Sequence, residues 1–308
     1  MTPIQNAKSL LVRDLTIYTG FAYMSRLTDF TAHSQITYSA PALPSEWAFD
    51  VPHFRTFGFV VTRRFFDARL IAAEIDHVMQ HGRKSSFKPS PSAQIHFQYV
   101  PMMTAETPAS LALLDRTETI AATLFDSPVL PTRAKGVRYS GNTAWHTDSD
   151  LPIASLGIVT YFESLGEESG ALCVLPGSHR AEFATALRSL GIAGKPAETL
   201  PSHAILTEPG DIIVFDEHLF HASFGGETRR QWRVDYIADP ANAEGEEQAR
   251  VYFRELYRPD WDGGYDVDRY PSYGSDWLHS PRRAVARLEA LGVYELAAKQ
   301  EAFARSRR

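Results

Sequence analysis

The sequence predicts a single, mainly β domain flanked by helices, with a core of the sandwich or barrel type. Between about residues 130 and 240, short apolar or alternating runs follow one another, separated by Gly, Pro, Asn and Asp. This texture is typical of all-β sandwiches and barrels. Apolar residues at helical spacing occur before and after this region. The sequence of 308 residues contains no internal repeat. One β core that carries outer helices is therefore the simplest prediction.

The N-terminal part is predicted to contain a strand and two helices. Residues 1–45 are mixed in character, and we expect an extension that wraps the domain. A strand is predicted around Gly58–Thr62, and a helix begins at about Asp67, a favourable N-cap. Its apolar residues lie near helical spacing: Leu70, Ile71, Ile75 and Val78. A second helix is predicted over 108–127, ending before Pro128.

Six short segments are predicted to supply the strands of the core. They read "RAKGVRYSGN", "SLGIVTYFES", "GALCVLPGS", "HAILTEPGD", "IIVFDEHLFH" and "RRQWRVDYIAD". After them, residues 280–306 have the pattern of one helix. We therefore place the domain at residues 46–240, with the core from about 130, and expect 241–308 to be a helical extension that packs on it. The N-terminal stretch and the Tyr-rich segment 257–277 are candidates for a lid.

Composition narrows the class of function. A net charge of −6 and a pI near 6.0 give no basic footprint for nucleic acid. The single cysteine, Cys173, rules out an intramolecular disulfide and a Cys-based zinc site. The sequence has no run of about 18 apolar residues and no apolar stretch of signal-peptide length at its start. We expect a cytoplasmic protein that acts on a small molecule, without a nucleic-acid or membrane partner. The oligomeric state stays open.

The segment "AWHTDSD", residues 144–150, places a histidine close to two carboxylates. In an extended segment residues i and i+2 point the same way, so His146 and Asp148 can aim at one point while Thr147 faces away. An imidazole and a carboxylate are two of the three ligands of the facial triad that holds Fe(II). The alternative is a hydrogen-bonded polar turn, and Asp150 is interpreted as such a turn carboxylate. A third ligand elsewhere in the chain is needed to distinguish the metal site from the polar turn.

The candidate third ligand is His221, in the stretch "PGDIIVFDEHLFHASFGGETRRQWRVDY" of residues 209–236. Its first three residues predict a tight turn that opens a strand at Ile212–Phe215. His221 ends the connection that follows, and Ser223 would share its face if the chain is extended. His218 competes for the role of ligand, although a surface or hydrogen-bonded role is favoured for it.

Together these parts resemble the phytanoyl-CoA dioxygenase-like branch of the Fe(II)- and 2-oxoglutarate-dependent oxygenases. Over roughly residues 50–240, "FRTFGFVVTRRFF" with its helix, "WHTD", "GALCVLPGSH" and "PGDIIVFDEHLFHAS" follow the family's order. The family's distal ligand lies ten residues after the Asp of Gly-Asp, which is His221. The resemblance implies a double-stranded β-helix (jelly-roll, cupin-like) core. It also implies Fe(II), 2-oxoglutarate and O₂, with His146, Asp148 and His221 as metal ligands.

The family also needs a basic residue to hold the distal carboxylate of 2-oxoglutarate, for which the planar fork of an arginine is suited. In the family it follows an Asn-x-Ser turn. Here the turn "FGGETRR" is shorter, and Arg229, Arg230 and Arg233 are candidates. Arg229 and Arg233 should face the interior if the alternate positions form the apolar outer face, namely Trp232, Val234 and Tyr236. The family spacing favours Arg229, with Arg233 second and Ser223 as a hydrogen-bond partner, unless a β-bulge reverses the alternation.

The resemblance implies oxidation of an unactivated C–H bond in a small molecule, with release of succinate and CO₂. Halogenating relatives carry a small residue in place of Asp148, so its presence favours hydroxylation, desaturation or ring closure over halogenation. We expect a substrate of specialised metabolism, while its identity and the position oxidised stay open. A cupin-like metal enzyme without 2-oxoglutarate would need a His-x-His pattern, which the sequence lacks. A non-catalytic binding barrel would have lost a ligand or the arginines, and all are present.

Overall fold

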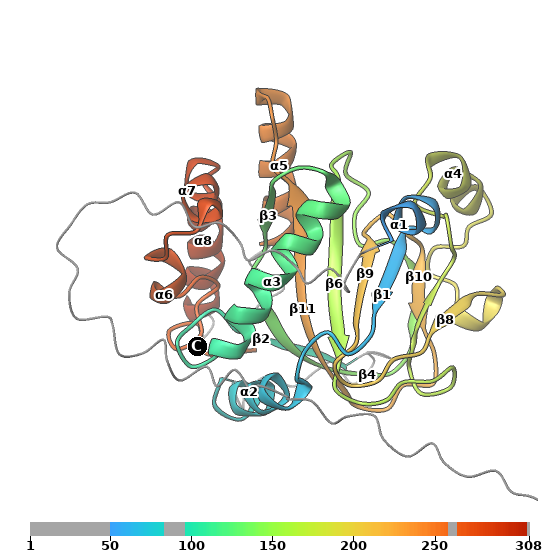
Figure 1. Ribbon diagram of the computed structural model, residues 1–308, viewed down its shortest axis with the longest axis horizontal. Coiled ribbons are helices and arrows are strands. Elements are labelled where there is room, and N and C mark those ends of the chain that lie inside the picture. Colours follow the sequence, from blue (N-terminus) through green and yellow to red (C-terminus); the bar gives the residue numbers. More distant parts are fainter. Residues whose placement is uncertain (1–49, 83–95, 258–263, 307–308) are drawn as a thin grey trace, which may run out of the picture. The chain divides into compact units, whose positions relative to one another are not determined.

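Two antiparallel sheets form the core of the residues that the computed structural model describes, 50–82, 96–257 and 264–306 (Figure 1). In this described part, the larger sheet has the strand order β1-β9-β6-β11-β4-β2, with β3 also paired to β11, and the smaller has the order β5-β10-β7-β8. The strands are β1 (Phe59–Thr62), β2 (His96–Pro101), β3 (Val129–Pro131), β4 (Lys135–Ser140), β5 (Thr143–His146), β6 (Ser155–Tyr161), β7 (Leu172–Val174), β8 (His203–Ile205), β9 (Ile212–Asp216), β10 (His221–Ser223) and β11 (Arg229–Ala238).

The two sheets face each other across one cavity. Its walls come from β4, β6, β9 and β11 of the larger sheet and from β5, β7 and β10 of the smaller. Side chains on the inner faces of two sheets that are closed in this way form a sandwich-like barrel. The predicted mainly β fold with flanking helices is therefore confirmed.

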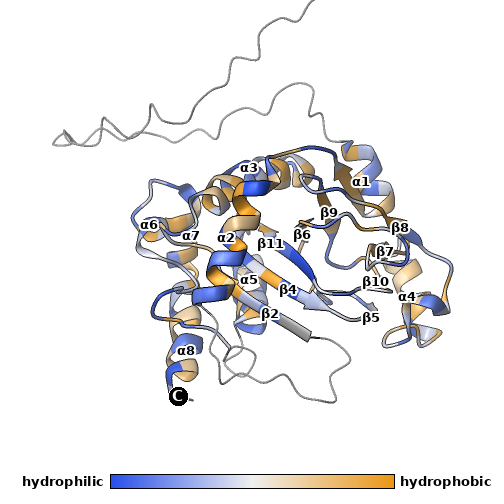
Figure 2. Ribbon diagram, turned by 90° about the horizontal axis from the view of Figure 1, so that it is seen from below, coloured by the Kyte–Doolittle hydropathy of each residue, from blue (hydrophilic) through white to orange (hydrophobic). Residues whose placement is uncertain are grey.

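Helices flank both sheets in the described part of the protein. They are α1 (Val51–Phe57), α2 (Ala68–His81), α3 (Pro108–Phe125), α4 (Ala181–Ser189), α5 (Ala243–Leu256), α6 (Ser275–Leu278), α7 (Arg283–Ala290) and α8 (Val293–Ser306). Helix α3 packs on β3 and β11, and α2 packs on β4 (Figure 1). Both helices alternate hydrophobic and hydrophilic residues along their length (Figure 2), and α2 buries Ile71, Ile75 and Val78.

The outward face of β11 is the apolar one that the sequence predicts. Trp232, Val234 and Tyr236 are fully buried. The Trp232 indole N–H donates to Ser110 Oγ at 2.8 Å, and the Tyr236 hydroxyl donates to the Leu114 carbonyl oxygen at 2.9 Å, both on α3. These two bonds satisfy the polar atoms of large buried aromatic side chains. They therefore fix which face of β11 turns toward the cavity.

Helices α2 and α3 agree with the sequence prediction, whereas α1 and β2 were not predicted and the predicted C-terminal helix differs from the structure. The Asp67 carboxylate accepts from the Arg69 backbone N–H at the start of α2, as expected of an N-cap. The single helix predicted over 280–306 is wrong: α7 and α8 are separate, and Gly292 between them has φ +75°. A left-handed residue ends a helix, and glycine adopts that conformation without a steric penalty.

Helices α5, α7 and α8 follow the β core in the chain, and α7 packs on β3 while α5 contacts α8. The predicted extension at 1–45 and residues 258–263 of the proposed lid lie outside the described residues. Within the described part, no helix is both long enough and apolar enough to cross a membrane.

Candidate metal centre and adjoining cavity

The pairing of β5 with β10 brings two histidines together. His146 ends β5, His221 begins β10, and the two are direct partners in the antiparallel register. Their ring centroids lie 4.2 Å apart. A register shift follows immediately, so that Ser223 pairs with Thr143. Strand pairing therefore places side by side two residues that are far apart in the sequence.

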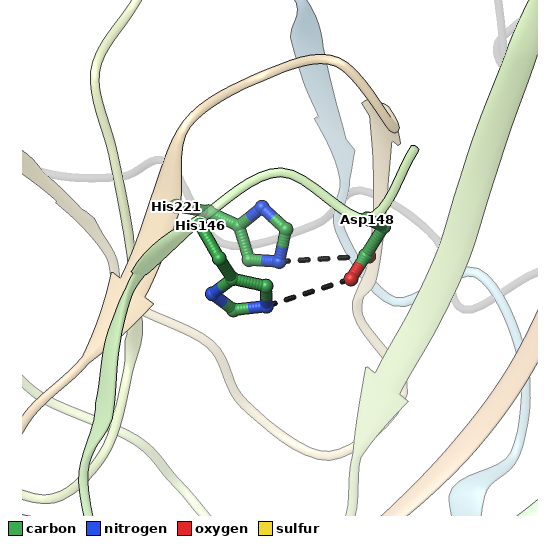
Figure 3. A group of neighbouring side chains, drawn as sticks. All are labelled: His146, Asp148 and His221. Carbon is green, nitrogen blue, oxygen red and sulfur yellow. Dashed lines mark ion pairs between the residues drawn. The ribbon is translucent and has the colours of Figure 1, made fainter. Parts of the chain in front are cut away.

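Asp148 reaches the same point from a turn and not from the strand, because β5 ends at His146. Its backbone N–H donates to the Glu217 carbonyl oxygen at 2.9 Å. The carboxylate then points back at the histidines (Figure 3). Its Oδ1 lies 3.5 Å from His146 Nε2 and its Oδ2 lies 3.5 Å from His221 Nε2. One ligand atom from each residue lies within 4.8 Å of the others.

The ring orientation of both histidines suits metal ligation. His146 Nδ1 lies 2.8 Å from the Ala144 carbonyl oxygen, and His221 Nδ1 lies 2.9 Å from the Leu219 carbonyl oxygen. A carbonyl only accepts, so each Nδ1 carries the proton and each Nε2 presents a lone pair. Two lone pairs and a carboxylate thus converge on one point. This arrangement of acceptors fits a divalent cation, and two imidazoles with one carboxylate are the facial set for Fe(II).

The surroundings of the site favour the metal-binding forms of Asp148 and His221, but not that of His146. Burial opposes ionisation of Asp148, yet Arg233 and the two imidazoles hold the pKa of its carboxyl well below the usual range. Only 17% of this side chain is exposed, although its backbone faces solvent. Burial lowers the pKa of His221. For His146, Asp148 outweighs burial and raises the pKa, so a metal ion competes with a proton there in acid solution.

A cavity of about 290 Å³ leads from these ligands to Arg229. The Arg229 side chain is buried, and its Nη2 donates to Ser223 Oγ at 3.0 Å. Its Cζ lies over the Tyr139 ring, 4.1 Å from the ring centroid. Gly170 and Gly226 make room for it, since a Cβ at either position would clash with Nη1. None of the ion pairs among the described residues involves Arg229. A buried guanidinium without a counter-charge is unfavourable, so this end of the cavity suits a carboxylate.

The three candidate arginines have different surroundings. Arg230 points away from the cavity and pairs with Glu163 at 2.8 Å and with Asp76 at 2.7 Å. Arg233 faces the cavity, but Asp148 at 2.8 Å and Asp235 at 2.6 Å already neutralise it. Of these three arginines, Arg229 is therefore the one whose charge is not paired among the described residues.

Most of the site residues predicted from the sequence line one cavity, whereas His218 and Asp150 do not. His146, Asp148, His221, Ser223, Arg229 and Arg233 all line the same cavity. His218 is held elsewhere, between Asp216 Oδ1 and the Leu151 carbonyl oxygen, both at 2.8 Å. Asp150 is 72% exposed and pairs with Arg188 at 2.6 Å.

Sequence reasoning missed Glu217. Its carbonyl oxygen accepts from Asp148, and its buried carboxylate accepts from the Tyr252 hydroxyl at 3.0 Å. The one feature of the sequence that could have indicated Glu217 is its position between the apolar strand β9 and a second apolar stretch.

Comparison with known proteins identifies the family and the fold. The sequence model of the phytanoyl-CoA dioxygenase (PhyH) family matches residues 54–234, more than half of the chain. A search of curated proteins returned no match. HygX from Streptomyces hygroscopicus, solved with nickel and 2-oxoglutarate, is 18% identical, with a TM-score of 0.50 over 66% of this chain and 94% of that one. This likeness confirms the double-stranded β-helix fold.

The non-heme α-ketoglutarate dependent epimerase SnoN from nogalamycin biosynthesis is 20% identical, with a TM-score of 0.49 over 61% of this chain and 81% of that one. The match to the family model covers both sheets and every strand that carries a candidate ligand. This chain belongs to the phytanoyl-CoA dioxygenase family of Fe(II)- and 2-oxoglutarate-dependent oxygenases.

Proposed function

We propose that this protein oxidises a C–H bond of a small molecule, with His146, Asp148 and His221 holding Fe(II). Arg229, assisted by Ser223, would hold the distal carboxylate of 2-oxoglutarate. One observation carries the proposal: a single cavity has three converging acceptors at one end and, at the other, a buried arginine that forms no ion pair with any described residue. Those two ends match the metal-chelating and carboxylate ends of 2-oxoglutarate.

Each residue has a defined task in this proposal. The iron, with 2-oxoglutarate and O₂, supplies the oxidising power for C–H cleavage when bound. The backbone carbonyls of Ala144 and Leu219 keep each histidine Nε2 unprotonated and aimed at the metal. Arg233 holds one oxygen of Asp148. The apolar lining residues Val159, Leu172 and Phe215 keep water from the reacting groups.

The presence of Asp148 supports hydroxylation or a related oxidation over halogenation, because the carboxylate fills the position that a halide would need. We infer a cytoplasmic enzyme acting on a specialised metabolite. Its lone cysteine suits a reducing compartment. We place the oxygenase domain at residues 46–240 and regard the helices of 241–308 as packed on it.

The test is anaerobic addition of Fe(II) and 2-oxoglutarate to the full chain. A weak visible charge-transfer band is expected in the wild type and absent in His221→Ala and Asp148→Ala. Asp150→Ala is the matched control, because this exposed carboxylate lies two residues away and pairs with Arg188. A metal that binds without any effect of 2-oxoglutarate would favour the cupin-like alternative. The absence of metal binding would favour the non-catalytic barrel.

A further inference from the structure

A second cavity of about 470 Å³ adjoins the first, and we name it the charged pocket. Asp148 and Arg233 line both cavities, so the charged pocket opens beside the candidate metal ligands. Its volume lies in the usual range for small-molecule sites. Resting on the function proposed above, we propose that the charged pocket binds the substrate and that Lys135 and Arg233 bind a carboxylate group of it.

Lys135 brings an ammonium group whose hydrogen-bonding capacity is largely unused. Only 12% of its side chain is exposed. In the described part of the protein, its Nζ makes a single hydrogen bond, to Asp235 Oδ2 at the long distance of 3.5 Å. An ammonium has three donors and strongly prefers to use them when it is buried. An acceptor in the pocket would satisfy the remaining two.

Arg233 adds further donors on the same wall. Its Nε donates to Asp235 Oδ1 at 2.6 Å and its Nη2 donates to Asp148 Oδ2 at 2.8 Å. Its Nη1 has no hydrogen-bond partner among the described residues and is not sealed from solvent. The guanidinium therefore holds the metal-ligand carboxylate with one nitrogen and presents another to the charged pocket.

Three of the carboxylates that line the charged pocket, those of Asp148, Glu217 and Asp235, are already engaged. Asp235 accepts from both Lys135 and Arg233. Glu217 accepts from the Tyr252 hydroxyl and lies 3.7 Å from Arg233. Asp148 is assigned to the metal. Donors are thus in surplus around Lys135 and Arg233, and the complementary ligand is rich in acceptors. A carboxylate supplies two acceptor oxygens in one plane, which suits an ammonium beside a guanidinium.

The lining also favours a polar ligand over a long acyl chain. Among the described residues, Leu151 and Leu256 are the aliphatic ones that line the charged pocket. A fatty-acyl substrate would need a continuous apolar channel, because each buried methylene is stabilised only by apolar surroundings. The substrate class is therefore a small polar carboxylic acid, whose carbons nearest to the carboxylate lie closest to the metal centre.

The experiment uses the full chain, anaerobic, with Fe(II) and saturating 2-oxoglutarate, so that the first cavity is filled. The probes are three matched sets of acid, primary amide and amine: propionate, propionamide and propylamine; lactate, lactamide and 1-amino-2-propanol; benzoate, benzamide and benzylamine. Binding is read from changes in the visible band and from the thermal midpoint. The acids are expected to bind in the millimolar range, and the amides about tenfold more weakly, as loss of one charge-assisted hydrogen bond predicts.

Three variants test the role of Lys135. Lys135→Met should raise the Kd of the acids about tenfold and remove the preference over amides. Lys135→Arg keeps the charge and should retain the preference, which separates loss of binding from misfolding. Lys299→Met, an exposed lysine on α8, should behave as the wild type.

Three outcomes would overturn the inference. The first is that no acid binds. The second is that the amines bind best and that their binding is lost in Glu217→Gln. The third is that Lys135→Met weakens the binding of 2-oxoglutarate and not that of the acids. If the visible band never forms, the proposed function fails. Acid binding is then still read from the thermal midpoint, which needs no metal.

Discussion

Asp148 and Arg233 form an ion pair of 2.8 Å on the wall that separates the two cavities. Asp235 also holds Arg233, at 2.6 Å from Nε, and Glu217 lies 3.7 Å from Nη2. The carboxylate proposed as a metal ligand is thereby fixed in direction before any metal arrives. A preorganised ligand costs less free energy to bind a metal than one that must be ordered.

Removing Arg233 should destabilise the protein strongly. In Arg233→Met, the mostly buried carboxylates of Asp148 and Asp235 lose their shared countercharge, and the free energy of unfolding should fall by about 3–5 kcal/mol. Urea denaturation of the metal-free protein measures this. Arg188→Met breaks an exposed pair with Asp150 and should cost only about 0–1 kcal/mol. Equal costs for the two variants would contradict the role given to Arg233.

Arg229 should control the affinity for 2-oxoglutarate. Arg229→Gln removes the buried guanidinium, and the Kd of 2-oxoglutarate should rise about 100-fold, equivalent to losing a bidentate charged contact. Anaerobic titration of the visible band measures the Kd. Arg230→Gln is the matched control, because its side chain pairs with Glu163 and Asp76 outside the cavity. A larger effect in Arg233→Gln than in Arg229→Gln would reverse the assignment.

The turn before Arg229 should depend on Gly225. This residue has φ +76°, and a Cβ there would collide with the Glu168 carbonyl oxygen. Gly225→Ala should therefore lower the thermal midpoint and weaken 2-oxoglutarate binding. Gly191→Ala provides the comparison, because Gly191 has φ +65° with nothing within 4 Å, so only the backbone penalty of about 1–2 kcal/mol applies. Weakened 2-oxoglutarate binding in Gly191→Ala would argue against a local effect.

His218 should make stability fall with rising pH. Its hydrogen bond to Asp216 raises the pKa from 6.5 to about 8. The protonated form is bound more tightly in the folded state, so this contribution is complete below pH 6.5 and is lost as the pH rises through 8. The shift corresponds to about 2 kcal/mol. Urea denaturation of the metal-free protein at pH 6 and pH 8.5 should show this loss in the wild type and a smaller one in His218→Gln. Equal pH dependence in the two proteins would show that other groups are responsible.

Local pattern was enough to predict much of this protein from its sequence. Alternation along residues 229–238 predicted that Trp232 and Tyr236 would face the helices, because successive side chains of a strand point to opposite sides of a sheet. The start of α2 followed from the capping chemistry of Asp67. The order of His146, Asp148 and His221 among Gly-rich turns carried the family resemblance. Such features need no knowledge of long-range contacts.

Tertiary structure decided which side chains from distant segments of the sequence come into contact. The pairing of β5 with β10 sets His146 against His221, and the contact with the Glu217 backbone, not strand alternation, turns Asp148 toward them. Arg229, Arg230 and Arg233 could not be separated by type or spacing. They differ because Asp76, Glu163, Asp148 and Asp235 neutralise two of them. The charge that a residue can offer to a ligand depends on its neighbours in space, and only the folded chain supplies those neighbours.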